Sequence, residues 1–215
     1  MRSIVLAIAS GKGGTGKSLL TVSLAVKAAS EGYHVAMVDL EPQSSVHLWW
    51  KLRGRPKNPT AVDASDRIPS DVVAGLRGEF DCILVDTSPL GMDRIEEAIR
   101  AADGVLIPVR ASVFDADAVR AVTEICKEHR KPFAFVAMDY DAGWRGLNAS
   151  MSSLLSKMGR VLDARTSHRS AYPASLNLGK SAAEHPDSRQ RKEAAAEIDE
   201  IWKAARTLVG QNGKR

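Results

Sequence analysis

The hydrophobic residues of this 215-residue chain gather in short, nearly continuous runs, and the segments between the runs repeat hydrophobic residues at helical spacing. Continuous apolar runs of this length are typical of parallel strands that are covered on both faces. The runs predict strands over residues 4–9, 35–38, 82–85, 105–109 and 133–138. The helical segments cover about residues 19–30, 44–53, 70–77, 93–101, 115–129 and 189–209.

This alternation predicts an α/β fold with a doubly wound, mostly parallel sheet flanked by helices, in a single domain over residues 1–215. A ligand is expected at the carboxyl ends of the strands. The segment 53–69, which is rich in proline and glycine, is interpreted as a surface connection. Pro108 is expected to end its strand or to place it at an edge, because proline has no N–H to donate to a sheet.

Composition narrows the class of protein only a little. Hydrophobic residues make up 44% of the chain and charged residues 26%, as in an ordinary soluble globular protein. The sequence has no run of about 18 apolar residues that could span a membrane, and its first residues lack the pattern of a signal peptide. Cys82 and Cys126 stand alone, as expected for small core residues in a reducing cytoplasm. We therefore expect a cytoplasmic protein.

The turn after the first predicted strand carries the strongest chemical signal. Its pattern, G-x-x-x-x-G-K-S, is that of a phosphate-binding P-loop between a strand and a helix. The glycines let successive N–H groups face one anion, and the helix that follows adds its positive dipole end. Lys17 supplies a charge for the β- and γ-phosphates, and Ser18 offers a hydroxyl to Mg²⁺. The predicted nucleotide-binding residues are Gly11, Lys12, Gly13, Gly14, Thr15, Gly16, Lys17 and Ser18.

A second lysine, Lys12, follows the first glycine of this loop, where an ordinary P-loop does not require one. The stretch from Lys12 to Ser18 resembles the deviant Walker A motif of the ParA/MinD family of ATPases. The resemblance implies a P-loop NTPase fold, ATP and Mg²⁺ as ligands, and a homodimer in which Lys12 reaches the nucleotide of the partner subunit. Lys12 and Lys17 are therefore candidate catalytic residues. The chain is most similar to small ParA partition proteins without an N-terminal DNA-reading extension, since its P-loop begins at residue 11.

Acidic residues follow the second and third predicted strands. Asp39 and Glu41 resemble the switch stretch of the family, in which a second Asp usually stands where this chain has Glu41. We expect Asp39 to act on the metal side and as a catalytic residue, and Glu41 to position the attacking water. Asp86 ends an apolar strand in the manner of a Walker B aspartate, whose carboxylate holds a water of the Mg²⁺ shell. The predicted metal-site residues are Ser18, Asp39 and Asp86.

The predicted base-binding position departs from the family pattern. Family members often have an Asn after the fifth strand to read adenine, whereas this chain has Met138 followed by Asp139. A carboxylate accepts hydrogen bonds and donates none, so Asp139 would suit guanine at least as well as adenine. ATP is the nucleotide that the resemblance implies. Trp144 could cover the base or could take part in ordinary packing.

The net charge of +4 is confined to the last quarter of the chain. Residues 1–159 balance 19 Lys and Arg against 19 Asp and Glu, whereas residues 160–215 carry 11 against 7. A basic end on a balanced body favours a local anionic partner. In the family, this part of the chain carries DNA contacts that do not depend on sequence. The candidate DNA-binding residues are Arg169, Lys180, Arg189, Arg191 and Lys192.

The sequence thus predicts an ATP-dependent dimerising ATPase that binds DNA non-specifically and positions or segregates a plasmid, a chromosome or a protein cargo. Hydrolysis is expected to be slow and to be stimulated by a small adaptor protein, and the protein is expected to associate with the nucleoid.

Three alternatives remain at this stage. A MinD-like membrane-cycling ATPase is disfavoured because Glu197, Asp199 and Glu200 oppose an anionic surface, and the apolar face of the last predicted helix is expected to pack in the core. No stable membrane association is therefore expected. A metal-cluster carrier would need cysteines between subunits, and the two cysteines lack that motif. A nucleotide-gated scaffold with negligible turnover stays open because of Glu41.

Overall fold

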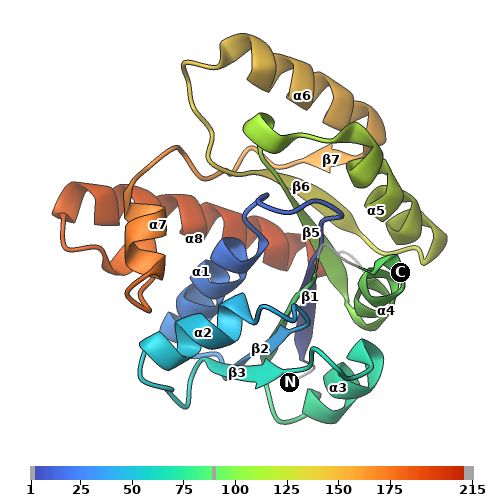
Figure 1. The fold of residues 1–215 in the computed structure, drawn as a ribbon, viewed down its shortest axis with the longest axis vertical. Coiled ribbons are helices and arrows are strands. Elements are labelled where there is room, and N and C mark those ends of the chain that lie inside the picture. Colours follow the sequence, from blue (N-terminus) through green and yellow to red (C-terminus); the bar gives the residue numbers. More distant parts are fainter. Residues whose placement is uncertain (1–2, 89–90, 211–215) are drawn as a thin grey trace.

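The computed structural model describes residues 3–88 and 91–210, and within them seven strands form one parallel sheet in the order β3-β2-β4-β1-β5-β6-β7 (Figure 1). The central strand β1 pairs with β4 on one side and with β5 on the other. The chain fills one half of the sheet first and then crosses to the other half, so a crevice opens at the carboxyl end of β1. The strands are β1 (Ile4–Ile8), β2 (Val35–Asp39), β3 (Thr60–Asp63), β4 (Cys82–Asp86), β5 (Gly104–Val109), β6 (Phe133–Ala137) and β7 (Arg160–Val161).

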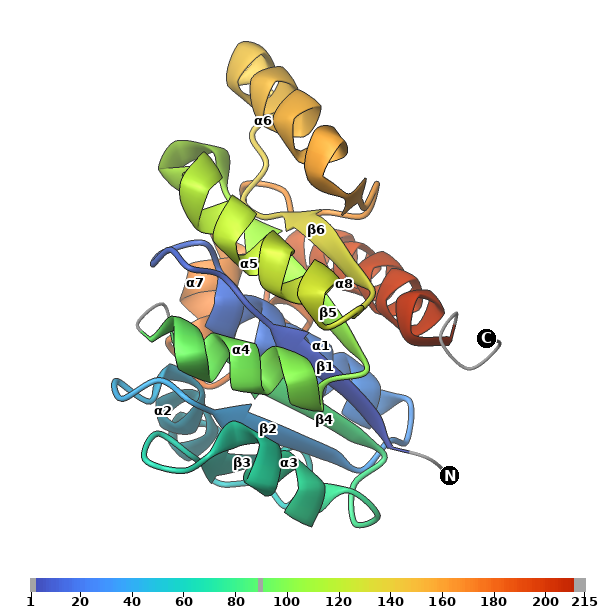
Figure 2. The same ribbon diagram turned by 90° about the vertical axis from the view of Figure 1, so that its right-hand side faces the viewer.

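Helices cover both faces of the sheet, as the continuous apolar strands predict. Buried residues of α1, α2, α7 and α8 form one core with the sheet, and buried residues of α3, α4, α5 and α6 form a second core on the other face. Figure 2 shows α3, α4 and α5 in front of the sheet, with α1 and α8 behind it. The helices are α1 (Lys17–Ser30), α2 (Ser45–Leu52), α3 (Pro69–Leu76), α4 (Met92–Ala101), α5 (Ala116–Glu128), α6 (Arg145–Met158), α7 (Ala171–Leu176) and α8 (Ser188–Gly210), with short 3₁₀ turns η1 (Ala111–Val113) and η2 (Ala182–Glu184).

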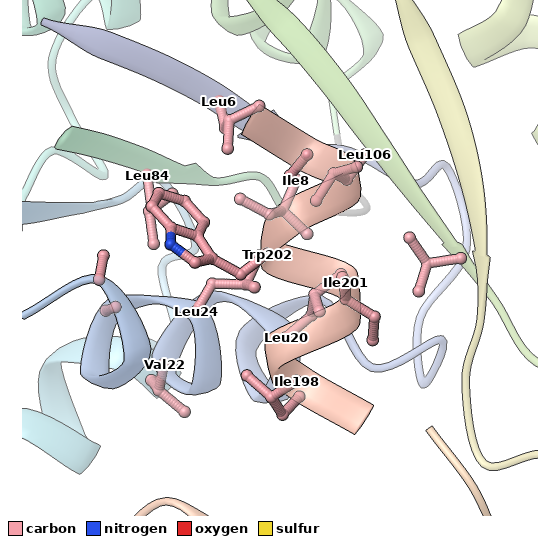
Figure 3. Packing of buried hydrophobic residues seen from close by; sticks show 14 of the residues in the cluster. Leu6, Ile8, Leu20, Val22, Leu24, Leu84, Leu106, Ile198, Ile201 and Trp202 are labelled. Atoms are coloured by element: carbon pink, nitrogen blue, oxygen red, sulfur yellow. The ribbon is translucent and has the colours of Figure 1, made fainter. Parts of the chain in front are cut away.

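The apolar face of α8 is buried inside the protein, which confirms the prediction of core packing for the last helix. Trp202 is fully buried, and its indole Nε1 donates a hydrogen bond to Glu31 at 2.9 Å. Ile198 and Ile201 belong to the same buried cluster as Trp202, together with residues of α1 and of the sheet (Figure 3). None of the described helices is long and apolar enough to cross a membrane.

Two local predictions were wrong. The segment interpreted as a surface connection contains β3, a half-exposed edge strand that pairs with β2 and lacks the apolar run of a buried strand. Pro108 does not end β5, which continues to Val109. Pro108 lies beyond Leu106, the last residue of β5 that pairs with β1, so at this level β5 pairs only with β6 and the missing N–H costs no ladder hydrogen bond.

The region after β6 holds elements that the sequence analysis did not predict. Helix α6 has a Ser-rich sequence, and only Asn148, Met151 and Leu155 of it are buried. Strand β7 has two residues, and α7 has six. Weak hydrophobic periodicity and short length hide such elements from pattern reading.

A loop after α7 packs tightly against the C-terminal end of α2. Gly179 has a φ of +65°, and a Cβ built on it would lie 2.4 Å from the backbone nitrogen of Arg53. The Arg53 guanidinium donates to the Gly179 carbonyl at 3.0 Å and pairs with Glu184 at 2.8 Å. This contact joins α2 to the segment between α7 and α8.

We expect Gly179→Ala to lower the free energy of unfolding by about 2 kcal/mol, because the new Cβ combines a positive φ with a backbone clash. Gly32→Ala is the matched control, since Gly32 also has a positive φ, of +90°, but nothing lies within 4 Å of its Cβ position. The control should lose about 1 kcal/mol in urea denaturation. Equal losses in the two variants would show that the contact with Arg53 is loose.

Candidate nucleotide-binding site

The turn between β1 and α1 has the backbone of a phosphate cradle. Gly14 and Gly16 have φ values of +74° and +96°, which residues with side chains rarely adopt. Gly16 is the N-cap residue of α1 and has no side chain to cap the helix, so the first N–H groups of α1 remain open to an anion. The Thr15 hydroxyl is buried and lacks a hydrogen-bond partner among the described residues. Such an unpartnered polar group fits a site that a ligand completes.

Lys17 lies inside this turn with its side chain almost fully buried. Its Nζ donates to the backbone carbonyl of Lys12 at 3.2 Å. Burial lowers the pKa of Lys17, and the nearby charges of Asp86 and Glu41 partly offset that effect. A buried ammonium group held by a weak backbone contact is well placed to pair with a stronger anion.

Ser18, Thr21 and Asp86 form a buried hydroxyl–carboxylate cluster next to the loop. The Ser18 hydroxyl donates to Asp86 Oδ2 at 2.7 Å, and the Thr21 hydroxyl donates to Asp86 Oδ1 at 3.0 Å. Burial raises the pKa of Asp86 to about 7 against the hydrogen bond from Ser18, and the charge of Asp39 raises it further. The Cα atoms of Asp39 and Asp86 are direct partners in the β2–β4 ladder, so both carboxylates lie at the same edge of the sheet.

Asp39 organises the turn that follows β2. Its carboxylate accepts hydrogen bonds from the backbone N–H of Glu41 at 3.1 Å and of His47 at 2.9 Å, and so ties the turn to the first residues of α2. Burial raises the pKa of Asp39, although the His47 and Glu41 N–H groups oppose that shift. Glu41 is half-buried, and its carboxylate accepts from the Ser45 hydroxyl at 3.1 Å. The structure therefore places Glu41 near Lys17, and Asp39 beside Asp86 with its carboxylate already bonded to backbone.

Lys12 lies at the mouth of the site. Its side chain is 48% exposed, and its Nζ pairs with Asp115 at 3.4 Å. Asp115 also caps α5, because its carboxylate accepts from the N–H groups of Asp117 and Ala118. Of the two P-loop lysines, Lys17 is turned inward, whereas Lys12 faces solvent and could reach a second molecule.

A cavity of about 390 Å³ opens beside the P-loop, on the side of β6 and α7. Gly16 and Met138 meet at its floor, since a Cβ on Gly16 would lie 3.2 Å from the Met138 methyl group. Trp144 is not among the residues that line this cavity, and 38% of its surface is exposed. The lining residues are Gly14, Thr15, Gly16, Leu19, Arg110, Met138, Asp139, Thr166, His168, Arg169, Ser170, Tyr172 and Pro173.

Several polar residues of this cavity were missed by the sequence analysis. Arg110 follows β5, whereas Thr166 and His168 follow β7. The tip of β5 was visible in the sequence, and a polar residue there is a usable signal for a ligand site. The other two residues follow a two-residue strand that the hydrophobic pattern does not reveal.

The candidate DNA-binding residues have different surroundings. Arg169 lines the cavity and pairs with Glu193 and with Glu197, the latter at 2.9 Å, so its side chain is only 22% exposed. The guanidinium of Arg191 donates to the backbone carbonyls of His185 and Pro186. The remaining three are exposed: Lys180 lies in the segment after α7, and Arg189 and Lys192 lie in the first turns of α8.

The two cysteines are buried, as the sequence analysis predicts. Cys82 lies in β4 and Cys126 in α5, and both are fully buried. Burial raises the pKa of each thiol to about 12, so neither is a reactive thiolate. Their position inside the protein is incompatible with a ligand role between subunits.

Comparisons with known proteins agree with this geometry. Residues 6–158 match the family model described as the CobQ/CobB/MinD/ParA nucleotide binding domain. The protein ParA of Rhizobium radiobacter is 35% identical over 115 residues, which are 52% of this chain and 51% of that protein. The chromosome-partitioning ATPase Soj of Thermus thermophilus is 27% identical over 154 residues, which are 58% of this chain and 62% of that protein. The matched residues therefore span about half of the length of that ParA protein and about three fifths of that Soj protein.

Solved structures show the same fold over almost the whole chain. A McdA variant from Cyanothece in complex with ATP superposes with a TM-score of 0.71 at 18% identity, covering 93% of this chain and 96% of that one. The septum site-determining protein MinD of Pyrococcus horikoshii, complexed with Mg-ADP, superposes with a TM-score of 0.69 at 19% identity, covering 94% and 97%. At this level of identity the likeness establishes the fold.

Proposed function

The chain belongs to the CobQ/CobB/MinD/ParA nucleotide-binding family, and from this premise we propose that it is an ATPase that dimerises on binding ATP. We further propose that the dimer binds DNA without sequence preference and positions or segregates a plasmid, a chromosome or a protein cargo. A small adaptor protein would stimulate its slow hydrolysis. The single domain over residues 1–215 would act near the nucleoid in the cytoplasm.

The observation that carries this proposal is the arrangement of the two P-loop lysines around one open cradle. Lys17 is buried where the phosphates of a nucleotide would lie, and Lys12 is exposed at the mouth. We assign phosphate binding to residues 11–18 and contact with the nucleotide of the partner subunit to Lys12. Binding of a subunit's own nucleotide accounts for the buried position of Lys17. The exposed Lys12 is suited to contact a nucleotide that is bound by another copy of the chain.

The hydroxyl–carboxylate cluster fits a Mg²⁺ ion. Ser18 already contacts Asp86 at 2.7 Å, and Asp39 lies at the same sheet edge, so the donor set consists of the oxygen ligands that Mg²⁺ prefers. Ser18, Asp39 and Asp86 would hold the ion directly or through water, and the ion would neutralise charge on the phosphates. Glu41, half-buried near Lys17, is the residue that we assign to positioning the attacking water.

Hydrolysis separates this proposal from a nucleotide-gated scaffold with negligible turnover. We expect an excess of protein to convert bound ATP slowly to ADP and phosphate in a single-turnover experiment, and to stop doing so when Mg²⁺ is chelated. Bound ATP that remains intact with Mg²⁺ present over many hours would favour the scaffold.

The exposed basic residues that follow α7 and begin α8 support the DNA-binding part of the proposal. We expect the triple replacement of Lys180, Arg189 and Lys192 by alanine to abolish ATP-dependent DNA retention and to leave nucleotide binding unchanged. Two copies of the patch in one dimer double the phosphate contacts, so binding should require ATP. In the wild type, log affinity should fall with log salt by about 0.9 for each phosphate contact, and this slope should flatten in the variant.

The matched control replaces Arg100, Arg120 and Lys127, three exposed basic residues on the opposite face of the sheet. The control removes the same charge and should retain DNA as the wild type does. If both triple variants lose DNA equally, the effect is one of net charge, and the proposed surface is wrong.

A further inference from the structure

The cavity beside the P-loop has a distinctive set of polar groups at its outer wall. Asp139 lies between Arg110 and His168. Its carboxylate forms an ion pair with Arg110 and accepts a hydrogen bond from His168 Nδ1 at 2.8 Å. All three residues line the cavity. The three come from the ends of β5, β6 and the segment after β7, so the sheet itself brings them together.

The backbone holds Asp139 firmly in this position. Its φ is +56°, in the left-handed region, and its N–H donates to the Thr166 hydroxyl at 3.0 Å. The side chain remains 23% exposed. Asp139 is therefore a fixed acceptor at the wall of a cavity that begins at the P-loop, where the base of a bound nucleotide would lie.

The chemistry of this wall suits both purines. A carboxylate only accepts hydrogen bonds, and both purines offer donors to it: adenine has its 6-amino group, and guanine has N1–H and its 2-amino group. Arg110 can donate to ring nitrogens or to a carbonyl oxygen, and the Nε2 atom of a neutral His168 accepts when its Nδ1–H donates to Asp139. A binding site rejects a wrong ligand when that ligand leaves one of its buried polar groups without a hydrogen bond. Neither adenine nor guanine would leave a polar group of this wall unpaired.

We propose that Asp139 is the base-recognising residue of this site, and that it accepts a hydrogen bond from adenine and guanine nucleotides alike. This inference rests on the proposed nucleotide site and specifies its substrate class as purine nucleotides with an amino or imino donor.

The test uses three diphosphates, so that hydrolysis and dimerisation do not intervene: ADP, GDP and purine riboside 5′-diphosphate, which has no amino group. We expect the wild type to bind ADP and GDP with dissociation constants less than about tenfold apart. The amino-free compound should bind about tenfold more weakly than ADP, because a hydrogen bond to a charged acceptor is lost. In Asp139→Gly, which tolerates the positive φ, ADP and the amino-free compound should bind alike.

Asp141→Gly is the matched control, because Asp141 is an acidic residue of the same loop that does not line the cavity. It should keep the wild-type difference between ADP and the amino-free compound. The inference is overturned if GDP binds ten times more weakly than ADP or worse, or if Asp139→Gly keeps the full difference between ADP and the amino-free compound. Failure of all three compounds to bind the wild type would instead contradict the proposed nucleotide site itself.

Discussion

Replacing Lys17 with alanine is expected to abolish the stabilisation that ATP gives to this protein. Ligand at about 100 times its dissociation constant should stabilise the wild type by roughly 2.7 kcal/mol, which is visible as a rise in Tm. Lys17 is 6% exposed, and its ammonium group lies in the turn that forms the phosphate cradle. Loss of this charge-assisted contact in a buried site should weaken ATP binding many-fold.

The measurement is thermal unfolding with and without Mg-ATP for the wild type, Lys17→Ala and Lys51→Ala. Lys51 is an exposed lysine of α2 and serves as the matched control. Without ligand, Lys17→Ala should be about as stable as the wild type, since burial already lowers the pKa of Lys17 and disfavours its charged form. An equal ATP-induced shift in all three proteins would refute the assignment of the P-loop.

Lys12→Ala should show the opposite combination of effects. It should keep most nucleotide binding and lose ATP-dependent dimerisation and turnover, because the side chain faces solvent and its proposed target lies in the other subunit. In the free subunit, Lys12 contacts only Asp115 among the acidic side chains described, at 3.4 Å, and this exposed pair contributes little to stability. The loss of dimerisation should therefore not reflect unfolding.

Lys127→Ala is a close control for Lys12→Ala. Lys127 is 49% exposed and pairs with Glu124 at 3.0 Å, so it matches Lys12 in exposure and in the type of contact that is lost. We expect it to dimerise and hydrolyse ATP like the wild type. Normal turnover in Lys12→Ala would leave Lys12 as an ordinary loop residue.

The site residues that could be predicted from the sequence are those whose positions follow from their immediate neighbours along the chain. The P-loop stands between a strand and a helix in the sequence itself, and Asp86 ends an apolar run, so the meeting of Ser18 with Asp86 follows from the parallel pairing of β1 and β4. The main strands of the sheet were predictable for the same reason, because each buried strand is a continuous apolar run. The positions of these strands along the chain could be predicted without knowledge of contacts between distant residues.

The remaining parts depend on contacts between distant residues. Arg169 resembles an exposed basic residue in the sequence, yet two glutamates one and two turns into α8 bind it and draw it into the cavity wall. Arg110 and His168 each lie 29 positions from Asp139 along the chain, and no local sequence pattern indicates that their side chains contact it. Strand β3 was missed because an edge strand with one half-exposed face needs no continuous apolar run.

The proposed ATP-dependent dimer is tested most directly by the mass of the wild-type protein in sedimentation velocity with Mg-ATP, with Mg-ADP and without nucleotide. We predict a dimer with Mg-ATP, and a monomer with Mg-ADP and in the absence of nucleotide. The same mass in all three conditions would contradict the proposal that ATP closes two subunits around the nucleotide.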